Sequence, residues 1–439
     1  MGGVSLFGLR HGTIFGEVAP YVAKEKAPGF TPLPQPTALG WLSSAPFLLL
    51  ISPNGVWVAI SLLIYSAFPY DLSPTSTAAA APLSLAFFAE RGPGWLAVTF
   101  AYAGFWHVAL YLLRLSKRPF IPGRPYNLMK TLHNVFWSFW GVLLWVAFEN
   151  VFCYLWATGR LRYAPDRDSF GGTAGGALRF AAALVGVPLW RAFHFYFSHR
   201  FLHFNALYKY VHSLHHRNTD IEPFAGLAMH PVEHLYYYAC VLPSLLFLCS
   251  PFAFLWNGVH LLLSPAASHS GWEDHFGGGF FHYAHHRYFD VNYAGADVAF
   301  IDAYFGSFAP SFSKEDKEGG VTLREDPKST LAGPPAADFV AYLAVAAAAL
   351  WVWARAALAL AAGGAPPPAG QALLIAALAG FGPVAAAELG AVLAGAEMGR
   401  PAPKGWGVGT YALHIVLGNL CCSVPVAWAC WLALQPAAT

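Results

Sequence analysis

Residues 199–216 read HRFLHFNALYKYVHSLHH, and residues 282–286 read HYAHH. These two stretches contain three histidine boxes: His199 and His203 in the first, His212, His215 and His216 in the second, and His282, His285 and His286 in the third. Side chains three or four residues apart lie on one face of a helix. Each box can therefore direct two or three imidazoles at a single point.

The number of imidazoles in the boxes indicates a centre with two metal ions. Imidazole is a good ligand for iron, zinc, copper and nickel, and eight imidazoles are more than one ion needs. The acidic residues nearby do not form the Glu-x-x-His pairs of soluble carboxylate di-iron bundles, so we expect nitrogen ligands to predominate. Iron in such a ligand set can change oxidation state and react with dioxygen, whereas zinc cannot change its oxidation state.

Other histidines surround the boxes, since fourteen of the eighteen lie between residues 194 and 286. His230, which precedes a proline, and His269, in the sequence SHSG, are expected as two further ligands. His194 could be an additional ligand, although it lies five residues before His199 and hence off its helical face. The remaining histidines are expected to be structural: His11, His107, His133, His234, His260, His275 and His414.

The composition is that of an integral membrane protein. Of the 439 residues, 56% are hydrophobic and 11% charged, whereas roughly 25% of residues are charged in ordinary globular proteins. The net charge of +2 and the lack of a basic run argue against nucleic-acid binding. The six cysteines form no Cys-x-x-Cys pair, so we expect small buried side chains rather than a zinc or redox site.

Apolar segments predict an all-α polytopic membrane protein, because a spanning helix needs about twenty apolar residues. The expected spans cover residues 46–68, 95–115, 132–156, 174–190, 339–362, 371–394 and 408–434, and the first is interrupted by a Pro-Asn-Gly sequence. Between His234 and His269 the apolar stretch is broken by three prolines. Each arm of that stretch is short for a full crossing, so a re-entrant hairpin is expected there.

The charges in the loops predict the orientation. Five basic residues and no acidic one lie from the end of the second expected span to the start of the third: Arg114, Lys117, Arg118, Arg124 and Lys130. The positive-inside rule places this loop in the cytosol. Two expected spans separate this loop from the first box, so the boxes lie on the same side of the membrane. There they would form a histidine-rich helical cap facing the cytosol.

These features divide the chain into four regions. They are an N-terminal region (1–94) with one expected span, a catalytic membrane domain (95–312), a charged linker (313–337) and a C-terminal three-helix membrane extension (338–439). All three boxes precede the linker, so we expect the extension to be dispensable for chemistry. Its small residues would suit helix packing, against the catalytic spans or against another chain.

Residues 190–308 resemble the fatty acid hydroxylase/sterol desaturase superfamily of membrane di-iron enzymes. Besides the boxes, the resemblance rests on PFA at 223–225, His230-Pro231, HSG at 269–271, NYA at 292–294 and FGS at 305–307. The His-Arg-x-x-His form of the first box is most similar to the sterol branch of C4-methyl oxidases and C5 desaturases. The chain departs from the family at Ala294, where members usually have glycine, and near His194, where an acidic residue often stands.

The resemblance implies a membrane enzyme of the endoplasmic reticulum that hydroxylates or desaturates a lipid, with a sterol as the favoured substrate. It implies two iron ions per chain, held by His199, His203, His212, His215, His216, His230, His269, His282, His285 and His286. Dioxygen is the oxidant, and electrons come from NAD(P)H through a b-type cytochrome and its reductase. The chain has no His-Pro-Gly-Gly haem-binding signature, so the cytochrome is expected to be a separate protein. It could dock on the five basic residues of the cytosolic loop.

Other functions remain open at this point. A fatty-acyl or ceramide hydroxylase, a carotenoid-ring hydroxylase or an alkylglycerol oxygenase would share the same boxes and differ only in the apolar walls around the substrate. A metal transporter with histidine-rich loops is a more remote alternative. Transporters tend to place ionisable ligands inside their spans near the midplane, whereas these boxes lie at span ends and in polar segments. Lipid oxidation that requires dioxygen would exclude transport.

Overall fold

The structure is a computed structural model, and it describes residues 53–116, 119–121, 126–166, 173–204, 207–241, 243–246, 249–273, 278–295, 298–310 and 407–434. Across these ranges every element is a helix, apart from an isolated bridge between Pro119 and Trp272. The predicted all-α class is therefore confirmed. The expected charged linker and the first two stretches of the C-terminal extension lie outside the described residues.

The helices form a bundle with shorter helical segments between its members. The first half of the chain contains α2 (Pro53–Ala67), α3 (Thr77–Ala80), α4 (Leu85–His107) with a π-helical continuation η1 (Val108–Leu112), α5 (Leu128–Ala157) and α7 (Ala174–Leu202). The histidine-rich region contains η2 (Tyr208–His212), α9 (Ser213–His216), η3 (Pro223–Leu227), α10 (Pro231–Tyr238), η4 (Ala239–Val241), α11 (Pro243–Leu246), α12 (Pro251–Ser268), α13 (Gly278–Tyr288) and α14 (Ala299–Tyr304). The C-terminal region contributes α18 (Val408–Cys421) and α19 (Ser423–Leu434).

Four of these helical segments are long and apolar enough to cross a membrane: Leu85–Leu112, Leu128–Ala157, Ala174–Leu202 and Val408–Val426. The chain is thus a multi-pass membrane protein, as its composition predicts. Two span limits differ from expectation at their far ends. Helix α7 continues through the first histidine box to Leu202, and the stretch 408–434 is broken into α18 and α19 at Cys422.

Helix α4 begins at Leu85, well before the expected residue 95, because a buried ion pair compensates the charge that interrupts the apolar pattern. The Ser84 side chain caps the helix by accepting a hydrogen bond from the Phe87 backbone N–H. About two turns later, Arg91 donates to Glu149 of α5 at 3.0 Å, and Trp95 donates to the same carboxylate at 2.7 Å. A buried charge is tolerated when it is paired and hydrogen-bonded in this way.

Helix α12 lies at the centre of the bundle and contacts α2, α4, α7, α13 and η3. Its residues from Pro251 to Ala266 are all buried, as expected for a helix that is apolar on every side. The chain reaches it through α10, η4 and α11, three short segments rather than one long helix. This arrangement is consistent with the expected re-entrant hairpin between His234 and His269, which has two short arms in place of two full spans.

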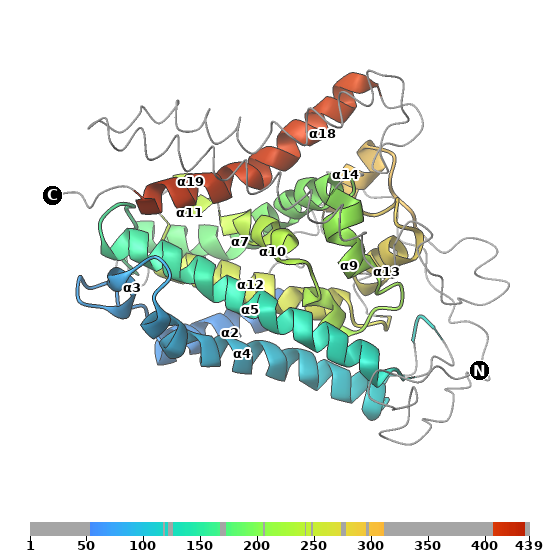
Figure 1. Ribbon diagram of the computed structural model, residues 1–439, viewed down its shortest axis with the longest axis horizontal. Helices are drawn as coiled ribbons and strands as arrows, with labels where there is room; N and C mark the ends of the chain where they lie inside the picture. Colours follow the sequence, from blue (N-terminus) through green and yellow to red (C-terminus); the bar gives the residue numbers. More distant parts are fainter. Residues whose placement is uncertain are drawn as a thin grey trace.

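The shorter histidine-bearing helices gather at one end of the bundle. Figure 1 shows α9, α13 and α14 at the end where α7 and α12 finish, with α3 and α11 at the opposite end. The long helices α4 and α5 run side by side between the two ends. The bundle therefore brings the C-terminal turn of α7 close to residues that come much later in the sequence.

Candidate metal centre

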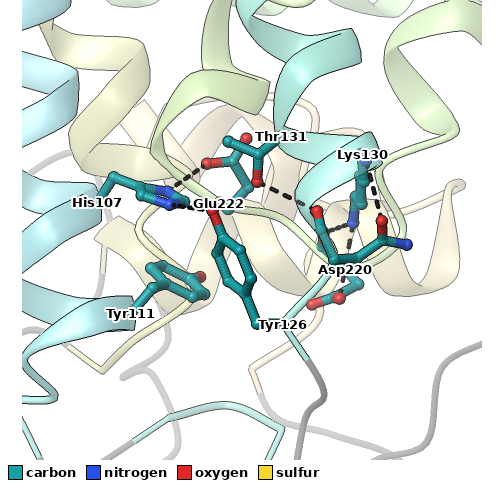
Figure 2. A pocket seen from close by; sticks show the side chains of 8 residues that line it. His107, Tyr111, Tyr126, Lys130, Thr131, Asp220 and Glu222 are labelled. Carbon is teal, nitrogen blue, oxygen red and sulfur yellow. Dashed lines mark hydrogen bonds and ion pairs between the residues drawn. The ribbon is translucent and has the colours of Figure 1, made fainter. Parts of the chain in front are cut away.

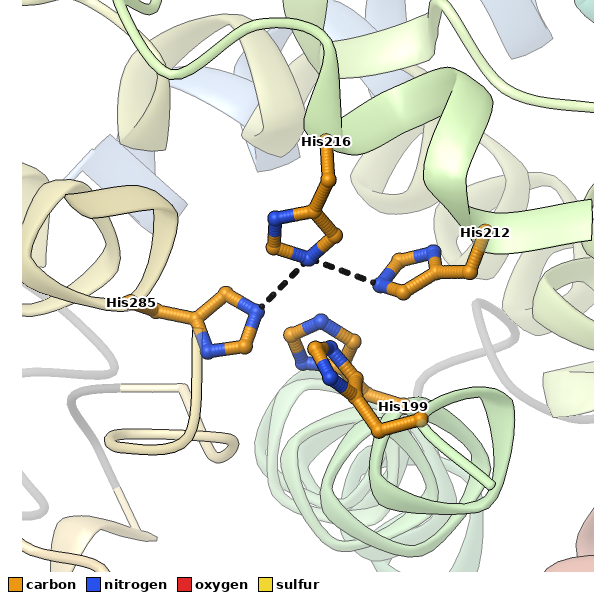
Figure 3. Close-up of side chains that lie close together, drawn as sticks. His199, His212, His216 and His285 are labelled. Atoms are coloured by element: carbon orange, nitrogen blue, oxygen red, sulfur yellow. Dashed lines mark hydrogen bonds between the residues drawn. The ribbon is translucent and has the colours of Figure 1, made fainter. Parts of the chain in front are cut away.

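Nine buried histidines converge in two groups. The five-histidine group contains His199, His203, His212, His216 and His285, and the four-histidine group contains His215, His269, His282 and His286. Within each group, one ring nitrogen from every residue lies within 4.8 Å of the others. Figure 3 shows the His199, His212, His216 and His285 rings pointing toward a common centre. The two groups are neighbours, since the His216 and His286 rings stack with their centroids 4.7 Å apart.

The second and third boxes each contribute to both groups. His212 and His216, four residues apart across the junction of η2 and α9, enter the five-histidine group, while His215 enters the other. In α13, His282 and His286 share one helix face and enter the four-histidine group, while His285 enters the five-histidine group. Adjacent residues on a helix point in different directions, so one short helix can serve two neighbouring centres.

Hydrogen bonds at the outer edge of the rings fix the orientation of four imidazoles. The Nδ1–H groups of His199, His285 and His269 donate to the carbonyl oxygens of Tyr293, Val291 and Pro265 at 2.8, 2.7 and 2.8 Å. His212 Nδ1 lies 2.8 Å from a Glu233 carboxylate oxygen. With the proton on Nδ1, each ring keeps its Nε2 lone pair for the interior, which is the arrangement of a metal-bound histidine.

The spacing of the Nε2 atoms fits a metal ion better than it fits hydrogen bonds. In the four-histidine group, the Nε2 atoms of His269, His282 and His286 are 3.0, 3.1 and 3.2 Å apart in pairs. Because His269 Nε2 carries a lone pair, no assignment of protons satisfies all three contacts. Neighbouring ligands of an ion with metal–nitrogen bonds of about 2.1 Å are separated by roughly 3.0–3.4 Å. One cation would satisfy all three lone pairs.

Burial favours the neutral form of four rings that lie outside the membrane spans. It lowers the pKa of His215 to about 4, and burial together with neighbouring imidazoles lowers the pKa of His282, His285 and His286 well below the usual value. The desolvated site therefore disfavours the imidazolium form. Neutral imidazole is the form that binds metal, so protons compete only weakly with a metal ion near neutral pH.

The structure does not bring His230 or His194 into either group. His230 is the N-cap of α10, and its Nδ1 accepts a hydrogen bond from the Val232 backbone N–H at 3.2 Å. His194 Nε2 lies 3.0 Å from the carbonyl oxygen of Cys421 in α18. Histidines expected to be structural also lie outside both groups, namely His107, His133, His234, His260 and His414. His11 and His275 are outside the described residues.

A buried loop after α13 supports two ligands of the five-histidine group, a role that the sequence analysis missed. The carbonyl groups of Val291 and Tyr293 accept the Nδ1–H bonds of His285 and His199, and Asn292 stands between them. The Asp302 carboxylate accepts from the backbone N–H of Tyr293 at 3.0 Å and of Ala294 at 2.7 Å. The NYA motif was visible in the sequence, but its hydrogen-bonding role depends on residues distant in the chain.

Glu233, one of the acidic residues near the boxes, is a second residue whose role the sequence did not reveal. It is buried on α10 and receives the Nδ1–H of His212. We expect Glu233→Ala to weaken iron binding by roughly 10- to 100-fold, the usual effect of removing a carboxylate behind a metal-bound histidine. Glu233→Gln keeps an acceptor oxygen and should lose less. Titrating purified protein with a competing chelator measures this loss, and equal iron retention in wild type and the alanine variant would contradict the role.

A polar pocket lies between α4, η1, α5 and the segment after α9. The Glu222 carboxylate has two partners in this pocket. It accepts a hydrogen bond from the Asn134 side-chain amide at 2.7 Å and lies 3.0 Å from His107 Nδ1. Figure 2 shows Lys130 next to Asp220 on the other side of the pocket, where the two form an ion pair at 3.6 Å. Tyr111 donates to the carbonyl of Ser270, the residue after His269, at 2.8 Å. The pocket residues thus connect the spans to the metal-binding segments.

The sequence of the metal-binding region matches a known family. Residues 184–307 match the family model described as Fatty acid hydroxylase. We call this matched segment, residues 184–307, the hydroxylase domain. All nine converging histidines lie within the hydroxylase domain. All-histidine groups suit iron, zinc, copper and nickel alike, and the match to the fatty acid hydroxylase family favours iron among these metals.

Curated relatives of the hydroxylase domain act on sterols, according to their names. Methylsterol monooxygenase 1 of Gallus gallus is 32% identical over 141 residues, covering 29% of this chain and 47% of the relative. A Delta(7)-sterol 5(6)-desaturase of Gibberella zeae is 32% identical over 26% of this chain and 37% of its own length. Lathosterol oxidase of Rattus norvegicus is 28% identical over 40% of this chain and 60% of its own length. The chain thus spans about half the length of the curated relatives it matches, and no solved structure is significantly similar to it.

Proposed function

We propose that this chain is a membrane oxidoreductase that uses two iron ions and dioxygen to hydroxylate or desaturate a sterol. The observation that carries the proposal is the pair of adjacent, buried, all-histidine groups within a fatty acid hydroxylase domain. The names of the curated relatives support a sterol rather than another lipid.

The nine histidines would hold one iron ion in each group. When bound, iron supplies the redox chemistry with dioxygen that an unactivated C–H bond requires. The protein contributes a dry site, because the nine side chains are buried and exclude bulk water. Phe195 of α7 stacks on His199 with ring centroids 4.7 Å apart and lies 6.1 Å from the His282 ring. It provides an apolar surface beside both groups, where a hydrocarbon substrate can approach without bringing water.

The proposed product and substrate can be tested by lipid profiling of cells that lack the protein. We expect a sterol precursor to accumulate, and we expect wild-type protein, but not His285→Ala protein, to reverse the accumulation. A loss of hydroxylated acyl chains or ceramides with unchanged sterols would instead assign the enzyme to another substrate of the same superfamily. Metal flux in vesicles without any dioxygen-dependent lipid product would indicate a transporter.

We further propose that the histidine-rich end faces the cytosol of the endoplasmic reticulum membrane and receives electrons from NAD(P)H through a separate b-type cytochrome and its reductase. The basic loop between α4 and α5 supports this orientation. Of the five candidate docking residues, Lys130 pairs with Asp220 and Arg114 is half-buried. Lys117, Arg118 and Arg124 lie outside the described residues.

Reversing the charges of Lys117, Arg118 and Arg124 to glutamate should slow turnover driven by the cytochrome and make it less dependent on salt. The reason is that long-range attraction between opposite charges raises the association rate and is screened by ions. Steady-state rates at several ionic strengths measure the effect. Turnover with a small uncharged chemical reductant serves as the control and should not change. Unaltered cytochrome-driven rates in a correctly inserted variant would place the docking surface elsewhere.

A further inference from the structure

Helix α18 lies outside the hydroxylase domain in sequence, but it packs along α7, the helix that carries the first box (Figure 1). Phe201, near the end of α7, and Phe204, just after it, form a buried cluster with Tyr411 and Ile415 of α18. A proline, Pro188, stands inside α7 before the first box. Proline removes a backbone hydrogen bond and weakens a helix at that point. The part of α7 that bears His199 therefore depends on its neighbours for a fixed position.

The two helices approach so closely that one position on α18 must be glycine. A Cβ atom built on Gly418 would lie 2.5 Å from both Cβ and Cγ of Phe201. That distance is well inside van der Waals contact, and Phe201 is itself fully buried. Nearby, His194 of α7 donates its Nε2–H to the carbonyl oxygen of Cys421 at 3.0 Å. This carbonyl is one of the last in α18, and such groups lack a partner within their own helix.

A directed chain of hydrogen bonds joins α18 to the first box. His414 donates its Nδ1–H to the Thr410 carbonyl at 2.9 Å, so its Nε2 can only accept. The Tyr196 hydroxyl lies 3.3 Å from that Nε2 and donates to it, while the buried Arg200 donates to the Tyr196 oxygen. Every donor in this chain meets an acceptor. His414 thus fixes the direction in which the Tyr196 hydroxyl points and, through it, the position of Arg200.

The chain continues from Arg200 to a metal-binding ring. Arg200 donates to the Ser307 hydroxyl at 3.0 Å, and Ser307 donates to Asp302 at 2.6 Å. The same Asp302 carboxylate holds the backbone N–H of Tyr293, whose carbonyl receives the Nδ1–H of His199. Hydrogen-bond partners behind a metal-bound histidine set its orientation and basicity.

We propose that α18 is a working part of the metal centre, with His414 as a positioning residue for the first-box helix and for His199. The inference rests on the proposed iron centre. It replaces the expectation that the C-terminal extension is dispensable for chemistry, because the described part of that extension holds α7 by a close approach and by hydrogen bonds. In this role α18 contributes no ligand; it restricts how far α7 can shift when iron is absent or exchanging.

The test uses full-length protein in lipid nanodiscs loaded with iron. Four variants are compared: His414→Ala, His414→Gln, Gly418→Leu and, as a matched control on the exposed side of α18, Leu413→Ala, whose side chain is 46% exposed. Iron release into excess chelator should be about tenfold faster in His414→Ala and Gly418→Leu, at the lower end of the range for residues behind a metal ligand. His414→Gln retains an acceptor for Tyr196 and should recover most of the wild-type rate. Leu413→Ala should match wild type.

Steady-state kinetics give a second readout that a purely structural role would not move. We expect His414→Ala to lower kcat with little change in KM. His414 belongs to the hydrogen-bond network behind His199 and does not contact the proposed substrate surface. Wild-type iron release and wild-type kcat in His414→Ala would overturn the inference while leaving the proposed function intact, since iron release does not depend on the substrate. A wild-type chain that takes up no iron would overturn both. If Gly418→Leu fails to insert into the membrane, the comparison of His414→Ala with His414→Gln still tests the inference.

Discussion

Replacing His215 or His285 by alanine should remove iron and product formation together. Each substitution takes one ligand from a different group, and the proposed reaction needs both ions. The buried neighbours cannot replace the lost nitrogen, because their rings are already held by hydrogen bonds to Tyr293, Pro265 and Glu233. The double variant should contain no iron and show only the background rate of metal-free protein. Elemental analysis and dioxygen-dependent product formation on the same preparation measure both effects.

His133→Ala is the matched control, because it removes an imidazole that belongs to neither group. His133 lies on α5 and interacts with Asn134 and Trp137 instead. This variant should retain wild-type iron and activity. Full activity in the His215→Ala/His285→Ala double variant would refute the two-iron proposal directly.

Asn292→Ala should damage both the stability of the protein and its metal site. Asn292 is buried, has a positive φ of 52°, and makes three side-chain hydrogen bonds, to the Phe281 carbonyl at 3.2 Å and to the Ala309 carbonyl and N–H at 3.0 and 2.8 Å. Each bond contributes about 1 kcal/mol, and alanine in the left-handed region costs about 1–2 kcal/mol more. The expected loss of folding free energy is about 4–5 kcal/mol. Iron affinity should also fall, by roughly 10- to 100-fold, because the flanking carbonyls orient His285 and His199.

Asn292→Gly separates the two causes. Glycine accepts a positive φ without strain but cannot make the hydrogen bonds, so it should recover only the strain component. Thermal unfolding in detergent and the chelator competition measure stability and iron binding on the same samples. An alanine variant that melts like wild type and keeps its iron would show that the loop is held mainly by Asp302.

The sequence alone predicted the helical class, the multi-pass character and the convergence of the eight box histidines, because those depend on local composition and spacing. It could not predict how the boxes divide between the two groups, since that depends on how the fold places α9 and α13 relative to each other. The early start of α4 was missed for a similar reason. The partner of Arg91 is Glu149, which lies on another helix and is distant in the chain.

The sequence around His230 contains the pattern of a helix start, although His230 was expected to be a metal ligand. His230-Pro231-Val232-Glu233 has a proline at the first helical position and a glutamate in the first turn, which is a pattern typical of a helix start. The structure has a helix starting there, with His230 as the N-cap. His269 likewise lies at a helix terminus, as the C-cap of α12. Helix α12 is central in the bundle, however, and its C-terminal end meets the second and third boxes. Only the packing of α12 distinguishes the two residues.

The division of each box between the two groups has a consequence for how the centre fills. Because α9 and α13 both supply ligands to each group, the first ion to arrive fixes the two helices that carry the remaining ligands. We expect this to reduce the ordering entropy that the second site still has to lose, so that the second ion binds more tightly than the first. At limiting iron, a population of chains should therefore consist mainly of empty and doubly loaded molecules, with few singly loaded ones. Native mass spectrometry can count the three species.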